Sequence, residues 1–169
     1  MSEIAELLER FRRGAELVAV AATGAAGAEL DWAPGPDKWS VRQILCHLAD
    51  SELHGANRFR GIIAEDNPTI VAYDQDAWAR DFDYHGLDAN LALSVLEAAR
   101  RWTVPVLERL GEEQWRREGT HTERGRYTVE DWLRGFAEHL VTHARQIERN
   151  TAAWKARPSG ETAKGSILA

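Results

Sequence analysis

The strongest constraint on the fold of this chain is a helical periodicity that recurs in four long segments. In each segment apolar residues return every three or four positions, which places them on one face of a helix. The segments cover residues 2–22, 40–65, 88–110 and 128 onward, and glycine, proline and aspartate are frequent between them. Four helices of this length predict an all-α four-helix bundle, formed by a single domain of residues 1–156.

Two of these helices carry start signals. Ser40 can cap the second helix with its hydroxyl, and Gln43 stands where its side chain can return to the cap, as in a capping box. Thr128 should cap the fourth helix in a similar way. Pro105 lies inside the third segment and should kink or shorten that helix, because proline has no N–H to donate.

The connection between the second and third helices is too long for a simple hairpin. Residues 66–87 form it, with a short helix expected near residues 75–80. A crossover of this length allows neighbouring helices to run parallel. It is rich in aromatic residues, namely Tyr73, Trp78, Phe82 and Tyr84. These rings either cover the end of the bundle core or wall a substrate cleft.

Three histidines stand where the helices should carry apolar side chains. His47 lies on or beside the apolar stripe of the second helix, and His139 and His143 lie one turn apart on the fourth. Rings four residues apart can bind one ion, and His47 can supply a third nitrogen if the two helices are neighbours. Three protein ligands leave a position for water or substrate, so we predict a metal centre. A helical bundle without a metal is the alternative if the histidines do not converge.

Few other side chains are well placed to serve this centre. Asp50 follows His47 by three residues and could orient a ligand or accept a proton, although an aspartate on a helix is most often solvated. Glu52 and Glu138 are less well phased. Cys46 points about 100° away from His47 around the helix and is predicted to be a small buried apolar residue.

The remaining histidines and the tryptophans are expected to have other roles. Helical phase does not link His54, His85 or His121 to the proposed ligands, so we expect these three on the surface. The tryptophans should pack in the core or at helix caps, at positions 32, 39, 102, 115, 132 and 154.

Composition narrows the class of protein. The formal net charge of -6 and the absence of a lysine- or arginine-rich tract argue against a nucleic-acid partner, and pairs such as Arg100-Arg101 look like solvated helix faces. A single cysteine excludes an internal disulfide framework. We expect a cytoplasmic protein, because the N-terminus lacks a signal-peptide pattern and no stretch reaches the roughly 20 apolar residues of a membrane span. Residues 157–169 are expected to form a flexible tail.

Three motifs in order resemble one family. The stretch from Lys38 to Glu52, the loop 68–78, and Tyr127 to Trp132 followed by 138–147 are similar to motifs of the DinB-like superfamily, in particular its YfiT-like metal-dependent hydrolases. The resemblance extends from Trp32 to Trp154. It implies a bundle with up-down-down-up connectivity, a divalent metal on His47, His139 and His143, and a homodimer. Some members of this family are thiol transferases that use low-molecular-weight thiols such as bacillithiol or mycothiol.

These observations lead to two functional hypotheses. The first is a small metalloenzyme that activates water or a low-molecular-weight thiol for hydrolysis or S-transfer on a small-molecule substrate, with zinc the expected metal and nickel or iron possible alternatives. The second is a noncatalytic bundle that binds metal or a protein partner, for example in a stress response. A fourth protein ligand would favour the second hypothesis.

Overall fold

The computed structural model describes residues 3–158, and the expected tail lies almost wholly outside them. Four long helices form a bundle: α1 (Glu3–Ala22), α3 (Val41–Ala64), α5 (Ala89–Leu107) and α7 (Val129–Ala156). Three shorter helices lie in the connections: α2 (Ala28–Asp31), α4 (Gln75–Asp81) and α6 (Glu112–Trp115). The helix α4 confirms the short helix expected in the crossover.

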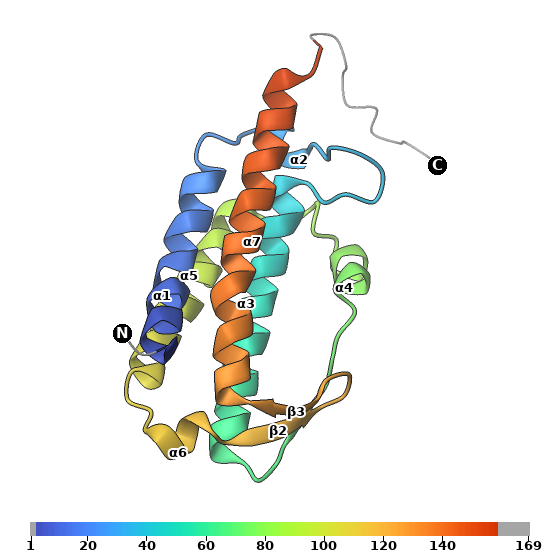
Figure 1. Cartoon of the computed structure of the whole chain (residues 1–169). Coiled ribbons are helices and arrows are strands. Elements are labelled where there is room, and N and C mark those ends of the chain that lie inside the picture. Colours follow the sequence, from blue (N-terminus) through green and yellow to red (C-terminus); the bar gives the residue numbers. More distant parts are fainter. Residues whose placement is uncertain (1–2, 159–169) are drawn as a thin grey trace.

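The four long helices are connected up-down-down-up, as expected. Figure 1 shows α1 and α7 rising together while α3 and α5 descend, and α4 lies on the crossover, where it packs against α3. Helix α1 packs against α7 and α5, and α3 packs against α5 and α7. The histidine-bearing helices α3 and α7 are therefore direct neighbours, which is the arrangement that a shared site requires.

Local capping explains where α3 and α7 begin. The Ser40 hydroxyl accepts a hydrogen bond from the Gln43 backbone N–H at 3.3 Å, and the Ser40 N–H donates to Gln43 Oε1 at 3.0 Å. The Thr128 hydroxyl oxygen accepts from the Asp131 N–H at 3.1 Å. Both predicted caps are confirmed, and they fix the start of the helices that carry the histidines.

A small sheet departs from the all-helical expectation. Strand β1 (Thr69–Ile70) pairs in parallel with β2 (Glu118–His121), and β2 forms a hairpin with β3 (Gly125–Thr128). Strands of two to four residues are too short to give an alternating sequence pattern. The sheet connects the crossover to the N-terminal end of α7, because β1 lies at the start of the crossover and β3 leads into that helix (Figure 1).

A buried ion pair joins all four helices of the bundle. Arg100 on α5 is 2% exposed and donates to both carboxylate oxygens of Glu52 on α3, at 2.7 and 2.6 Å. It also donates to the carbonyls of Phe11 on α1 and Phe136 on α7, at 2.6 and 2.7 Å. The expectation that Arg100 is solvated was wrong. The Arg100-Arg101 pair in the sequence gives no sign that a carboxylate on another helix would pair with Arg100 in the core.

Exposed apolar residues give a second correction. Trp102 was expected to pack in the core or at a cap, but it is 75% exposed on α5.

Helix α5 ends at Leu107, two residues beyond Pro105, and not at Leu110 as expected. Among residues 3–158, no helix has both the length and the apolar character that crossing a bilayer would need.

Candidate metal centre

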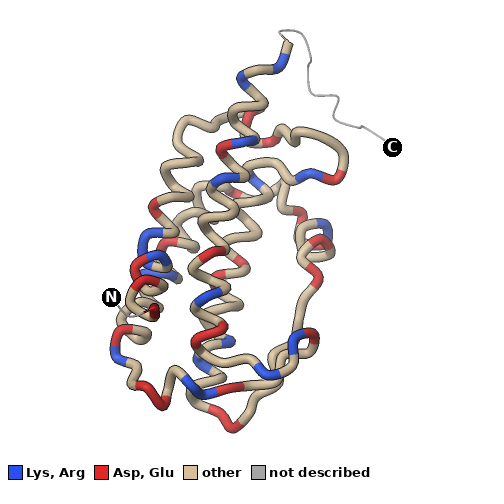
Figure 2. Tube along the Cα trace, in the orientation of Figure 1, with Lys and Arg blue, Asp and Glu red and all other residues tan. Residues whose placement is uncertain are grey.

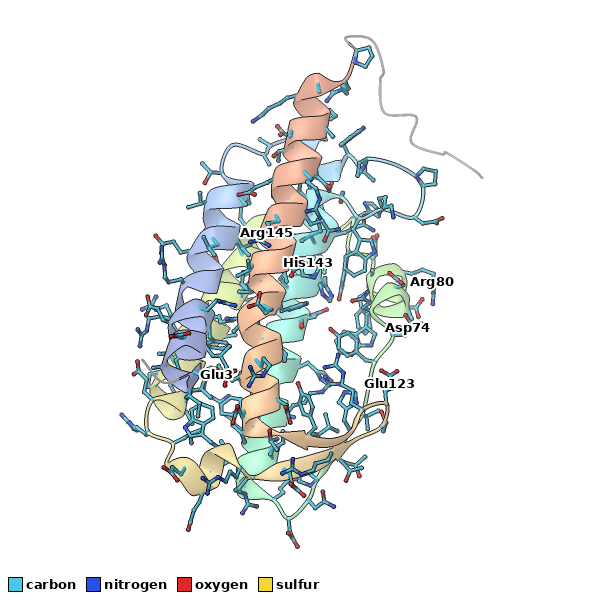
Figure 3. All side chains as sticks on the ribbon, viewed as in Figure 1. Glu3, Asp74, Arg80, Glu123, His143 and Arg145 are labelled. Carbon is cyan, nitrogen blue, oxygen red and sulfur yellow. The ribbon has the colours of Figure 1, made fainter. Side chains whose placement is uncertain are left out.

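The three predicted histidines converge between α3 and α7. The Nε2 atoms of His47 and His139 lie 3.2 Å apart. The rings of His139 and His143 have centroids 4.7 Å apart, and His47 and His143 are 5.0 Å apart. One nitrogen from each of the three rings lies within 4.8 Å of the others, so a single small ion could be reached by all three. In Figure 3, His143 lies on the side of α7 that faces α4.

Burial keeps these rings neutral. His47 is 2% exposed, and burial lowers its pKa to about 3, with a smaller effect from His143. Burial also lowers the pKa of His139 to about 2, and the nearby charges of His143, His47 and Arg100 act in the same direction. The pKa of His143 is lowered by burial, against a hydrogen bond to Gln146 that raises it. At neutral pH each ring therefore has a lone pair free to bind a cation.

Gln146 orients His143 and was not identified from the sequence. Its Oε1 lies 2.8 Å from His143 Nδ1, so a proton on Nδ1 is donated to the amide oxygen and Nε2 is left as the acceptor. The two residues are three positions apart on α7, a spacing that puts them on one face of the helix. That spacing was the available signal, but a glutamine on a helix is usually solvated and did not stand out.

Apart from the contact between their Nε2 atoms, the rings of His47 and His139 are held by packing. The Nδ1 atoms of His47 and His139 are buried and have no hydrogen-bond partner among residues 3–158. The Trp39 ring lies 4.8 Å from the His47 ring, and the Phe136 ring lies 6.0 Å from that of His139. Gly55 makes room for Phe136, since a Cβ at this glycine would come within 2.2 Å of the phenyl ring. Trp39 and Phe136 thus form apolar walls on two sides of the histidines.

Asp50 is bound to the crossover. The Tyr84 hydroxyl donates a hydrogen bond of 2.6 Å to Asp50 Oδ2. Burial and this bond raise the pKa of Tyr84, so the hydroxyl keeps its proton. Asp50 remains a predicted proton acceptor of the site, now with Tyr84 as its partner.

Cys46 is buried as expected. Burial raises the pKa of its thiol to about 11, and the protonated thiol is a poor nucleophile.

The crossover covers more of α3 than the sequence indicated. His54 was expected on the surface but is partly buried, with the Tyr73 ring 5.1 Å and the Trp78 ring 5.6 Å away. His121 was also expected on the surface but is 7% exposed, beside Tyr127. Only His85 is exposed as predicted. Helical phase could not place His54 or His121, because both are covered by segments distant in sequence.

Comparisons with known proteins agree with this arrangement. The sequence profile of the DinB superfamily matches residues 7–147. A protein of Oceanobacillus iheyensis named "Putative metal-dependent hydrolase OB0782" is 32% identical over 119 residues, covering 70% of this chain and 69% of the relative. The Bacillus subtilis protein named "Putative metal-dependent hydrolase YfiT" is 31% identical over 116 residues, which cover 66% of this chain and 65% of that protein.

A solved structure shows the same fold. It is described as "YfiT from Bacillus subtilis is a probable metal-dependent hydrolase with an unusual four-helix bundle topology", and it matches with a TM-score of 0.79 at 23% identity, covering 90% of each chain. At this identity the match establishes the arrangement of helices.

Proposed function

The chain belongs to the DinB superfamily, and from this premise we propose that it is a metal-dependent enzyme whose ion is held by His47, His139 and His143. The convergence of three neutral imidazoles, of which His47 is buried and His139 and His143 are half-buried, carries the proposal. Burying a polar ring costs free energy unless it is paired, and a shared ion would pair the converging nitrogens. The names of the relatives, metal-dependent hydrolases, support the same assignment.

The donor set fits a divalent metal. Two imidazole nitrogens bound tetrahedrally at about 2.05 Å should lie about 3.3 Å apart, and the Nε2 atoms of His47 and His139 are 3.2 Å apart. The three donor nitrogens together span up to 4.8 Å, so a small ring movement would be needed for all three to bind one ion. Three neutral imidazoles suit zinc best among common ions, and they also accept nickel or iron. When bound, such an ion would lower the pKa of a water or a thiol and so supply a nucleophile near neutral pH.

The remaining residues would shape and serve the reaction. Trp39 and Phe136 exclude water from two sides of the histidines, which strengthens electrostatic interactions in the site. Asp50 is three residues from His47 and can take up a proton from the nucleophile, while Tyr84 holds that carboxylate in place. We therefore propose hydrolysis, or S-transfer from a low-molecular-weight thiol, as the reaction class.

The test begins with metal content. Protein purified without a polyhistidine tag should contain close to one metal ion per chain by elemental analysis, and a His139→Ala/His143→Ala variant should contain none. His85→Ala is the matched control, because His85 is exposed and is not one of the three converging histidines. Equal metal content in all three proteins, or no uptake of zinc or nickel by the wild type, would refute the metal site.

Activity is tested separately from binding. The metal-loaded wild type and the His85→Ala variant should hydrolyse ester or amide substrates, or transfer a low-molecular-weight thiol to an electrophile, and His143→Ala should not. Circular dichroism of each variant shows whether the helical fold is retained. A protein that binds metal but turns over none of these substrates would favour the noncatalytic alternative.

A further inference from the structure

A polar stripe runs down α3 from the metal centre. His47 is followed on α3 at three, four, seven and eleven positions by Asp50, Ser51, His54 and Arg58, a pattern that places the five residues on one face of the helix. Eleven residues separate the first from the last, which corresponds to a rise of about 16 Å. The stripe thus extends well beyond the three histidines and ends in a guanidinium group.

The aromatic crossover lies over this stripe. Tyr84 bonds to Asp50 near its upper end. Lower down, the Tyr73 ring lies 5.1 Å from the His54 ring, and the guanidinium carbon of Arg58 lies 5.6 Å from the Tyr73 centroid. Arg58 also donates to the carbonyl of Val71. The crossover therefore contacts the stripe along most of its length.

The β2–β3 hairpin closes the lower end and brings a second guanidinium. Arg124 stands in the hairpin turn with its guanidinium carbon 6.0 Å from the Tyr127 centroid, and the His121 ring lies 5.5 Å from Tyr127. The pKa of His121 is lowered by burial and then by the charges of Arg58 and Arg124. The Thr122 N–H of the hairpin turn donates to the Ile70 carbonyl at 3.0 Å, and Arg58 donates to the carbonyl of the next residue, Val71, so the hairpin turn and the Arg58 guanidinium meet at the same part of the crossover.

The two arginines lack a paired carboxylate. Within residues 3–158, neither Arg58 nor Arg124 forms an ion pair at 4.0 Å or less, whereas Arg126 of the same hairpin pairs with Glu118 at 2.6 Å. Glu123 precedes Arg124 in the hairpin turn, where Figure 2 shows acidic and basic positions side by side, and Figure 3 places Glu123 beside the crossover. Arg58 and Arg124 therefore bring two positive charges to this end of the stripe without a paired carboxylate among the described residues.

We propose that Arg58 and Arg124 bind an anionic group, a carboxylate or a phosphate, at the end of the substrate remote from the three histidines. The proposal rests on the proposed function, because it takes the stripe on α3 as the floor of the substrate cleft. Arginine presents parallel N–H donors that match the oxygens of both anions. A substrate that spans the stripe carries its reactive bond near His47 and its negative charge near Arg58, which defines an elongated anionic small molecule.

The test uses simple anions and protein from which metal has been removed. A metal ion at the histidines would otherwise bind the anions itself. Inorganic phosphate and succinate are titrated separately at constant ionic strength, and binding is followed by NMR shifts of the arginine side chains. We expect saturable binding to the wild type and to Arg126→Gln, the matched control from the same hairpin. In Arg58→Gln/Arg124→Gln the affinity should fall by about tenfold or more, and Arg58→Lys should retain part of it. The anion that binds more tightly identifies the substrate group.

Three results bear on the proposal separately from the metal site. Saturable binding that also persists in His139→Ala/His143→Ala would support the anion site even if the histidines held no metal. No saturable binding of either anion would overturn it. Equal affinity in the wild type and in Arg58→Gln/Arg124→Gln would also overturn it, since the anions would then bind elsewhere.

Discussion

The burial of neutral histidines predicts that the metal-free protein loses stability in mild acid. An unfolded histidine has a pKa of about 6.5, whereas the folded values for His47 and His139 are about 3 and about 2. Below pH 6.5 the unfolded chain binds protons that the folded chain cannot, so the free energy of unfolding falls as the pH falls. The loss continues until the pH reaches the folded pKa values.

The expected magnitude follows from these values. At pH 5 the solution is about 1.5 pH units below the pKa of an unfolded histidine. Each of the two rings therefore lowers the free energy of unfolding by about 2 kcal/mol, relative to a ring that stays uncharged in both states. Together His47 and His139 should remove about 4 kcal/mol between pH 7 and pH 5, and His143 acts in the same direction. This is a large share of the stability of about 5–15 kcal/mol that is typical of a folded domain.

Urea unfolding of chelator-treated protein at pH 7 and pH 5 measures this loss. The His47→Gln/His139→Gln variant should lose about 4 kcal/mol less than the wild type over the same interval, because its uncharged side chains do not titrate. His85→Gln controls for removal of a histidine as such. An equal loss of stability in the wild type and in the double variant would refute the reasoning, and the acid sensitivity would then arise elsewhere.

Two further substitutions test charge and packing. Glu52→Gln should lower the free energy of unfolding by about 3–5 kcal/mol, because it leaves the buried Arg100 guanidinium without its counter-charge. The control Glu118→Gln removes an exposed ion pair and should lower it by at most about 1 kcal/mol. Similar losses for the two variants in urea unfolding would refute the role of the buried pair. Gly55→Ala must displace Phe136, and we expect weaker zinc binding by calorimetry with a net destabilisation of up to about 2 kcal/mol. Gly61→Ala, which has space on the same helix, should stabilise by about 1 kcal/mol, and unchanged zinc affinity in Gly55→Ala would contradict the proposed role of the phenyl ring.

Local signals made the helices and the histidine cluster predictable. The caps at Ser40 and Thr128 depend on residues three positions away, and the phase of His139 and His143 depends on residues four positions away. Such short-range relations are visible in a sequence. The placement of His47 near them required α3 and α7 to be neighbours, which the resemblance to the DinB-like superfamily implied and the structure confirms.

Long-range pairings were not predictable from this chain alone. The partners Glu52 and Arg100 are 48 positions apart, and helical phase did not connect them. The burial of His54 and His121 depends on the crossover and the hairpin, whose strands are too short to give a pattern. Each of these features depends on which segments meet in space, and a single sequence carries little information about that.

The packing around the three histidines bears on when a metal would enter. Small zinc domains stay unfolded until the ion arrives, because they have no other core. Here two apolar clusters hold the four helices together, and Trp39 and Phe136 pack against the rings of His47 and His139. We therefore expect the bundle to fold before a metal binds, and under the proposed function the ion acquired would depend on which ions are available after folding.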